Sequence, residues 1–307
     1  MEKKQFSPAI LFQITRPLQV LIAVFTYALG LGIVNYLGKA IQWSIAILGS
    51  ILIAAIIAAW HLLKAYFQYP SQLPVDRFNR RDGEGSLLFI ETAEVPRIAI
   101  LQTALITLAL GATVTVLLIA NGAISLSSLL ILLVSMVLAT IDFLPPIELC
   151  KKGYAELIEA FLLVNISPAL AFLIQKPEAH ILLVMLTLPL MFVYLAYQIV
   201  VSFEYFDHSP RQTTCSMIGR IGWQRCVVLH NLSILFAFLL IAAFLLFGLP
   251  WPLAWPIFLA LPLGLIQIIQ MVKLADGSKP NWKLLWVNSL GTFLFLVYLI
   301  TFTLWVK

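Results

Sequence analysis

The residues best suited to chemistry lie in three polar segments, at about 68–96, 144–156 and 204–225. Each is longer and more mixed in composition than a simple connection between helices. If the three lie on one side of a membrane, their charged residues can converge over one opening. Such an opening suits a substrate with an anionic head and a long apolar tail. The alternative explanation is that these loops are charged only because membrane topology requires it.

The middle segment has the most distinctive pattern, Pro-Pro-Ile-Glu-Leu-Cys-Lys-Lys-Gly-Tyr-Ala-Glu-Leu at 145–157. The two prolines end a helix, because proline lacks the backbone donor that a helix interior needs. Lys151 and Lys152 present adjacent positive charges, and Gly153 permits a tight turn. Glu156 then opens the next helix at its N-terminal end, where negative charge is favourable. The segment is therefore predicted to hold two cations between helices.

The elements that position these segments are membrane-spanning helices. Apolar residues make up 62% of the 307 residues and charged residues 11%, whereas soluble domains are about 45–50% apolar. Nine apolar runs come near the roughly 20 residues that span a hydrocarbon core. We therefore expect one polytopic membrane domain over residues 1–307. The runs are Arg16–Leu37, Ile41–Tyr66, Ile98–Ile119, Ser125–Phe143, Leu157–Ile174, Ile181–Phe203, Cys226–Phe247, Trp251–Met271 and Leu284–Trp305.

The basic residues predict the orientation of these spans. Of the 19 Lys and Arg residues, 15 fall in the N-terminal segment and the loops that follow even-numbered spans, and three fall on the other side. The richer side belongs in the cytoplasm, so we expect a multi-pass cell-membrane protein with its N-terminus inside and its C-terminus outside. The net charge of +5 mostly reflects this asymmetry and an attraction to anionic lipid. It does not indicate nucleic-acid binding.

Three segments of the chain, in the order that the family has them, resemble motifs of the UbiA superfamily of intramembrane prenyltransferases, especially its dihydroxynaphthoate polyprenyltransferase-like branch. Residues 145–157 resemble the family pattern PP-(hydrophobic)-x-L-x-x-(K/R)-G-x-x-E-L. The run Thr15-Arg16-Pro17 resembles the family's opening T-R-P. The run Arg-Gln-Thr-Thr-Cys-Ser-Met-Ile-Gly-Arg at 211–220 resembles (K/R)-R-T-L-A-x-x-L-G-(K/R). Nine spans with an inside N-terminus also match the family layout.

The resemblance implies an all-α, nine-helix bundle around a central cavity. It also implies transfer of a polyprenyl group from its diphosphate to a small aromatic or quinone-precursor acceptor, as in menaquinone biosynthesis. Family members hold Mg²⁺ with two Asp-rich segments, N-D-x-x-D-x-x-x-D after the second span and D-x-x-x-D after the sixth. The metal neutralises the charge that develops on the departing diphosphate.

Both Asp-rich segments depart from the family pattern here. The first is Lys64-Ala65-Tyr66-Phe67-Gln68-Tyr69, and the second is Glu204-Tyr205-Phe206-Asp207-His208. By the resemblance, Asp76, Glu204 and Asp207 could still hold one Mg²⁺, which accepts one or two carboxylates with water and phosphate. Alternatively, basic side chains bind diphosphate directly, without metal. These candidates are Lys64, Arg77, Lys151, Lys152 and Arg211.

The missing acids also allow a second hypothesis. The chain would then be a catalytically inactive family relative that binds or carries an isoprenoid lipid, or that assists a partner enzyme. Lys64 is either a ligand or a lysine that reaches the membrane surface. His61, one turn earlier, either joins the pocket or packs in the bundle, and Asp142 faces either the cavity or water at a helix end.

The three cysteines, Cys150, Cys215 and Cys226, all lie near the predicted cytoplasmic face. A reducing compartment argues against disulfides there, and the cysteine spacing fits no metal site. We therefore expect small apolar residues with free thiols.

The orientation can be tested with reporter fusions at the C-terminus. Since the ninth span is predicted to end outside, a phosphatase that folds only outside the cytoplasm should be active there, and a cytoplasm-dependent fluorescent protein should be dark. The same pair of reporters fused after residue 154 should give the reverse result. Activity of the phosphatase at residue 154 would contradict the predicted orientation.

Overall fold

The structure is a computed structural model that describes residues 8–69, 72–74, 89–91, 95–208 and 215–306. Within these residues, nine helical stretches are long and apolar enough to cross a membrane. Each matches one predicted span to within a few residues, so the predicted all-α, nine-helix class is confirmed for the described chain. The structure adds one small feature that was not predicted: β1 (Gln72–Pro74) pairs antiparallel with β2 (Phe89–Glu91).

The spans follow one another with short connections on one side and longer ones on the other. The first four, preceded by α1 (Pro8–Ile14), are α2 (Pro17–Tyr36), α3 (Trp43–Phe67), α4 (Arg97–Ala120) and α5 (Leu126–Phe143). The fifth consists of α6 (Ala155–Phe161), η4 (Leu162–Ile166) and α7 (Ser167–Leu173), and is preceded by η3 (Leu149–Lys152). The sixth is α8 (Ile181–His208), followed by the short α9 (Met217–Ile221). The last three are α10 (Trp223–Leu246), then α11 (Trp251–Ala254) with η6 (Trp255–Ala260) and α12 (Leu261–Ala275), and finally α13 (Trp282–Val306).

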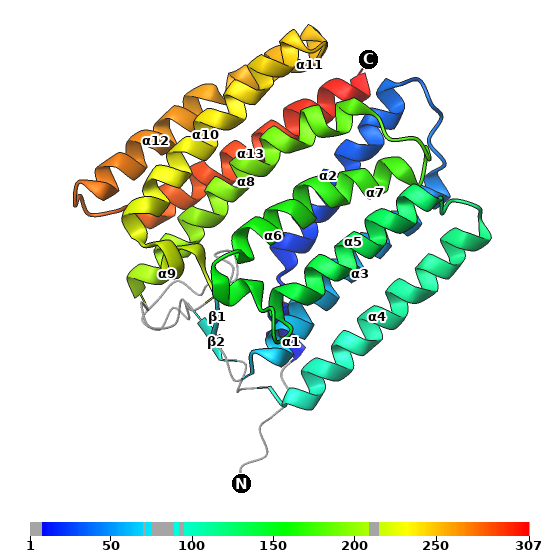
Figure 1. Ribbon diagram of the computed structural model, residues 1–307, viewed down its shortest axis with the longest axis horizontal. Helices are drawn as coiled ribbons and strands as arrows, with labels where there is room; N and C mark the ends of the chain where they lie inside the picture. The colour runs from blue at the N-terminus through cyan, green and yellow to red at the C-terminus, as the bar shows by residue number, and fades with distance from the viewer. Residues whose placement is uncertain (1–7, 70–71, 75–88, 92–94, 209–214, 307) are drawn as a thin grey trace.

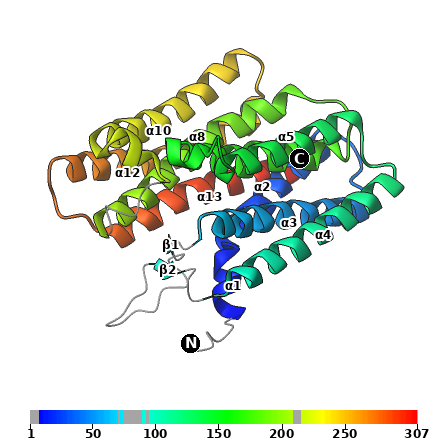
Figure 2. The ribbon, with the colours of Figure 1, turned by 60° about the horizontal axis from the view of Figure 1, so that its bottom comes forward.

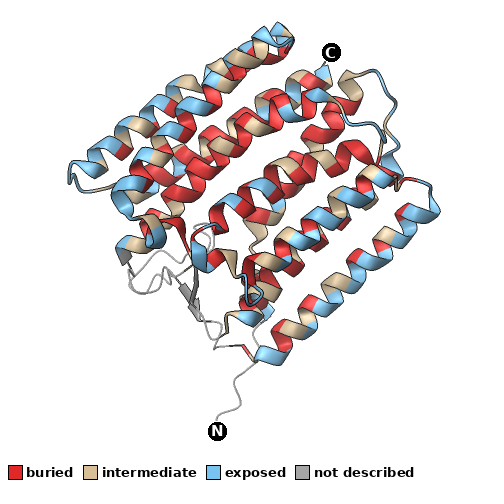
Figure 3. Ribbon diagram, in the orientation of Figure 1, coloured by how far each residue is buried: buried red, intermediate tan, exposed pale blue. Residues whose placement is uncertain are grey.

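The spanning helices lie roughly alongside one another, with α4 at one edge of the bundle and α12 at the opposite edge (Figure 1, Figure 2). Between these edges, α3 packs on α4, α8 packs on α10 and α13, and α2 packs on α7 and α13. The core is continuous through α2, α7, α8 and α13, while α4 exposes most of its surface (Figure 3). We call the end that carries α1, α9, β1 and β2 the polar end. The C-terminus lies at the other end (Figure 1).

The start of α2 brings a basic side chain to the polar end. Pro17 occupies the first turn of the helix, where its missing N–H costs nothing. A residue before proline is disfavoured in the right-handed helical region, and Arg16 instead has φ 51° and ψ 71°. A left-handed conformation is unusual for arginine. At Arg16 this conformation turns the backbone sharply between α1 and α2.

The fifth span contains a turn of π-helix at Leu162–Ile166. Such turns leave backbone carbonyl groups available to other partners. The Leu163 carbonyl accepts a hydrogen bond from Thr26 Oγ1 at 2.5 Å, and Ser167 Oγ donates to the Ala23 carbonyl at 2.5 Å. Both bonds join this span to α2, and the first of them uses a carbonyl group of the π-helical turn.

Close packing of α2 on α7 depends on Gly30. A Cβ atom there would overlap the carbonyl oxygen of Pro168 and lie 2.8 Å from the Ala171 Cβ. Gly30→Val should therefore separate the two helices and destabilise the fold by about 1–3 kcal/mol. Thermal unfolding of the purified protein should show a lower midpoint.

The matched control is Gly291→Val in α13, where a Cβ meets no atom within 4 Å. That variant should unfold close to the wild-type temperature. Equal losses in the two variants would mean that helix propensity, and not the contact with α7, determines the effect.

Candidate functional site

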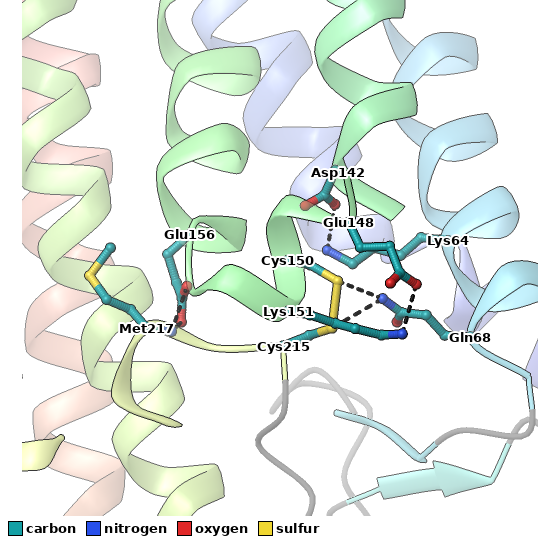
Figure 4. The surroundings of a disulfide bond; sticks show 9 residues. All are labelled: Lys64, Gln68, Asp142, Glu148, Cys150, Lys151, Glu156, Cys215 and Met217. Atoms are coloured by element: carbon teal, nitrogen blue, oxygen red, sulfur yellow. Dashed lines mark hydrogen bonds and ion pairs between the residues drawn. A yellow bond between two sulfur atoms is a disulfide. The ribbon is translucent and has the colours of Figure 1, made fainter. Parts of the chain in front are cut away.

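Three polar segments that are distant in sequence meet at the polar end. Gln68, at the end of α3, places its Nε2 2.9 Å from Cys150 Sγ in η3 and 3.3 Å from Cys215 Sγ before α9. Figure 4 shows these side chains together with the neighbouring charged residues. The expected convergence of the three segments is thus confirmed for their described parts.

A buried ion pair lies on the inner side of this junction. Lys64 Nζ of α3 is 2.6 Å from Asp142 Oδ2 of α5. The Asp142 side chain is fully buried, and the Lys64 side chain is 17% exposed. The ammonium group also lies 5.4 Å from the centre of the Trp60 ring, a cation–π distance. Lys64 therefore points into the bundle and neutralises an acid, and Asp142 faces the interior.

A second buried carboxylate, that of Glu159 in α6, is surrounded by donors. The Tyr194 hydroxyl donates to its Oε1 at 2.9 Å, and Gln198 Nε2 donates to the same oxygen. Tyr194 and Gln198 are one turn apart on α8 and so share a face. Arg16 Nη1 lies 3.8 Å from the other carboxylate oxygen. A buried charge needs such partners, and here they come from the approach to α2 and from α8.

Glu156, one turn earlier on α6, joins this helix to the segment after α8. Its two carboxylate oxygens accept the backbone N–H of Met217 at 2.9 and 3.0 Å, and Ser202 Oγ donates to it at 2.7 Å. The Glu-Leu motif at the start of α6 therefore has a structural role, because its carboxylate caps the first residue of α9.

The two acids proposed for metal binding that the structure describes, Glu204 and Asp207, differ in burial. Glu204 is buried near the end of α8, whereas Asp207 is exposed and accepts a hydrogen bond from Trp282 Nε1 at 3.1 Å. Asp76 lies outside the described residues. Across the described parts of the chain, no three His, Cys, Asp or Glu side chains are grouped to hold a metal ion. The side chains that α3 brings toward the site are the Lys64 ammonium and the Gln68 amide. Mg²⁺ is bound mainly by carboxylates, so the described residues do not fit a magnesium centre.

Two of the remaining cationic candidates, Lys151 and Lys152, lie at the rim of the polar end. Lys151 and Lys152 are exposed, and Lys151 Nζ pairs with Glu148 Oε1 at 2.7 Å. Arg77 and Arg211 lie outside the described residues. The structure thus brings Lys64, Lys151 and Lys152 to the same end of the bundle, with Lys64 partly buried and the other two exposed.

Sequence reasoning missed Arg16, Glu159, Tyr194 and Gln198 as parts of this site. A signal was available for two of them, since Tyr194 and Gln198 are polar residues spaced by four on one apolar helix. His61 is buried and its ring lies tilted against that of Trp60, with ring centres 4.6 Å apart, as expected for a packing residue. The expectation of free thiols at Cys150 and Cys215 is wrong, because the structure joins them in a disulfide.

The Lys64–Asp142 pair should be essential for folding, because removal of one partner leaves an uncompensated buried charge. Lys64→Met should lower the free energy of unfolding by about 3–5 kcal/mol. The double variant Lys64→Met/Asp142→Leu should recover much of that loss, since neither charge remains. Thermal unfolding of the four proteins in one detergent measures the coupling.

The control for this cycle is Lys176→Met at the opposite end. Its pair with Glu178 is 3.9 Å long, and the Glu178 side chain is 81% exposed. Exposed pairs contribute about 0–1 kcal/mol, so this variant should be nearly neutral. Additive losses in the double variant would show that Lys64 and Asp142 do not depend on each other.

Comparison with known proteins identifies the fold. No protein-family model and no curated protein matches the sequence. A solved UbiA homolog from Archaeoglobus fulgidus bound to GPP and Mg²⁺ is similar in structure, with a TM-score of 0.62 and 17% identity over 94% of this chain and 99% of that one. The same homolog bound to DMAPP and Mg²⁺ matches with a TM-score of 0.58 and 15% identity, over 94% of this chain and 98% of that one. The chain therefore has the fold of the UbiA homologs.

Proposed function

We propose that the chain is a member of the UbiA superfamily that transfers a polyprenyl group from its diphosphate to an aromatic or quinone-precursor acceptor. The charge arrangement at the polar end carries this proposal. Lysines occupy the rim, and the carboxylates of Asp142, Glu156 and Glu159 are buried just inside it. The structural neighbours that bind GPP and DMAPP support a prenyl diphosphate as the substrate.

This separation of charge suits the ionisation of an allylic diphosphate. When the bond between C1 and oxygen breaks, its electron pair goes to the diphosphate and C1 becomes positive. Lys151 and Lys152 stabilise the departing anion from the rim, and buried carboxylates stabilise the cation from within. A ring carbon of the acceptor then bonds to C1 and loses its proton. Glu159, held between Arg16 and Tyr194, is the carboxylate that we assign to accept this proton.

No step of this scheme passes through a metal ion, because the described residues do not fit one. The solved neighbours contain Mg²⁺ beside the prenyl diphosphate. A magnesium site in this chain remains a prediction, with Asp76, Glu204 and Asp207 as its ligands. Direct contacts to the diphosphate also remain a prediction, and the residues predicted to make them are Lys64, Arg77, Lys151, Lys152 and Arg211. A comparison of reactions with and without Mg²⁺ distinguishes the two sets.

One observation favours a second function, the binding or carriage of an isoprenoid lipid without transfer. The Lys64 ammonium is already neutralised by Asp142, and the Gln68 amide contacts two sulfur atoms. In the family pattern these two positions are an asparagine and an aspartate, both at the metal site. A protein that kept the bundle and lost catalysis would also show such internal pairing.

The test is isotope-labelled prenyl transfer by the purified protein. Geranyl and longer diphosphates are offered with a panel of quinone precursors, with and without Mg²⁺. Wild-type protein should form a prenylated product, and Glu159→Gln should lose at least about 100-fold in rate because it cannot accept the proton. Glu178→Gln, at the opposite end, should retain full activity. Binding of the labelled diphosphate is measured in parallel for each protein.

The outcomes separate the two functions. Product formation that is lost in Glu159→Gln while diphosphate binding persists supports the transferase. Product that requires Mg²⁺ and disappears in Asp207→Ala would support the predicted metal set. No product from protein that binds the diphosphate would overturn the transferase and favour the lipid-binding function.

A further inference from the structure

The disulfide between Cys150 and Cys215 joins two connecting segments across the polar end. Cys150 lies in η3, between α5 and α6, and Cys215 lies directly before α9. The two residues are 65 positions apart in sequence, and their Cα atoms are 4.6 Å apart. Cys150 is fully buried, whereas Cys215 is partly exposed. A soluble reagent therefore reaches Cys215 first.

Two further contacts hold the same pair of segments together. Glu156 accepts the backbone N–H of Met217, and a Cβ at Gly153 would lie 2.7 Å from the Arg220 Cβ. Gly153 has φ +83°, a conformation that favours glycine. The two cysteines thus stay close even when the covalent bond is open, so the bond can form again without a large rearrangement.

Gln68 gives the pair a polar environment at both sulfur atoms. Its Nε2 lies 2.9 Å from Cys150 Sγ and 3.3 Å from Cys215 Sγ (Figure 4). A donor at this distance favours a thiolate over a thiol, and the thiolate is the form that reacts in disulfide exchange. Cys226, the third cysteine, is buried in α10 and bonded to no other cysteine.

We propose that Cys150 and Cys215 form a reversible redox lock that fastens α9 to the α5–α6 connection at the polar end. The Cys215 thiolate attacks a small-molecule disulfide, forms a mixed disulfide and releases one thiol. The Cys150 thiolate then attacks the Cys215 sulfur and releases the second thiol. The two cysteines lose two electrons and two protons, and the small disulfide gains them as two thiols.

The lock is independent of the proposed transferase activity, since it concerns only how firmly α9 is held. On the side that the sequence predicts to be cytoplasmic, a reducing poise keeps such a bond open, and oxidation closes it. When the bond is open, the Glu156–Met217 hydrogen bonds and the packing of Gly153 on Arg220 still connect the two segments, but no covalent bond does. The segment around Arg220, which is exposed, should then unfold locally more often.

The test is a redox titration of the full-length protein in membranes, with reduced and oxidised glutathione in varied ratio. Free thiols are blocked with light N-ethylmaleimide, the protein is reduced, and the released thiols are labelled with heavy reagent for mass spectrometry. Cys150 and Cys215 should change from light to heavy label together, at one glutathione ratio. Cys226 should carry light label throughout, or no label where it is inaccessible.

A second measurement reports on α9 itself. Trypsin cleavage after Arg220, which is exposed, should be roughly threefold to tenfold slower in the oxidised wild-type protein than in the reduced one. Cys150→Ser should cleave at the reduced rate under both conditions, and Cys226→Ser should behave as wild type. Gln68→Leu should form the bond more slowly.

Two results would overturn the proposal. One is independent labelling of Cys150 and Cys215, or light label on both at the most oxidising ratio. The other is an equal rate of cleavage after Arg220 in oxidised and reduced wild-type protein. Both comparisons use the wild-type chain, so they hold even where a cysteine variant fails to fold.

Discussion

Burial of carboxylates at one end of an apolar bundle is the constraint on which the arrangement of the polar end depends. An ionised acid in a low-dielectric interior is costly unless a cation or several donors accompany it. Asp142 has the Lys64 ammonium, Glu159 has Tyr194, Gln198 and Arg16, and Glu156 has the Met217 N–H. These partners come from different helices, so the acids hold the helix ends in fixed relative positions.

The same contacts determine how charge is distributed. Positive side chains that face outward, such as Lys151 and Lys152, form a rim, and the buried acids lie inside it. In the transfer that we propose, the anionic head of the substrate lies at the rim and its apolar tail among the helices. Its reacting carbon would then lie nearest the carboxylates, which is where a developing positive charge is stabilised.

The fold is shared with the UbiA homologs, but the residues at the polar end differ from the family pattern. The fold is shared at 15–17% identity, yet the positions that resemble the first Asp-rich segment hold Lys64 and Gln68. Both have found partners within the chain, in Asp142 and in the cysteine sulfurs.

The sequence by itself determined the number of spans in the described chain, their boundaries to within a few residues, and the segments that carry polar residues. Run length and apolar composition decide whether a helix crosses a membrane, and both can be read directly. The resemblance motifs also located the converging segments. By contrast, the pairs Lys64–Asp142, Tyr194–Glu159 and Cys150–Cys215 join residues 78, 35 and 65 positions apart. Only the tertiary structure decided them, because a helix that is apolar on all sides does not reveal which face meets a neighbour.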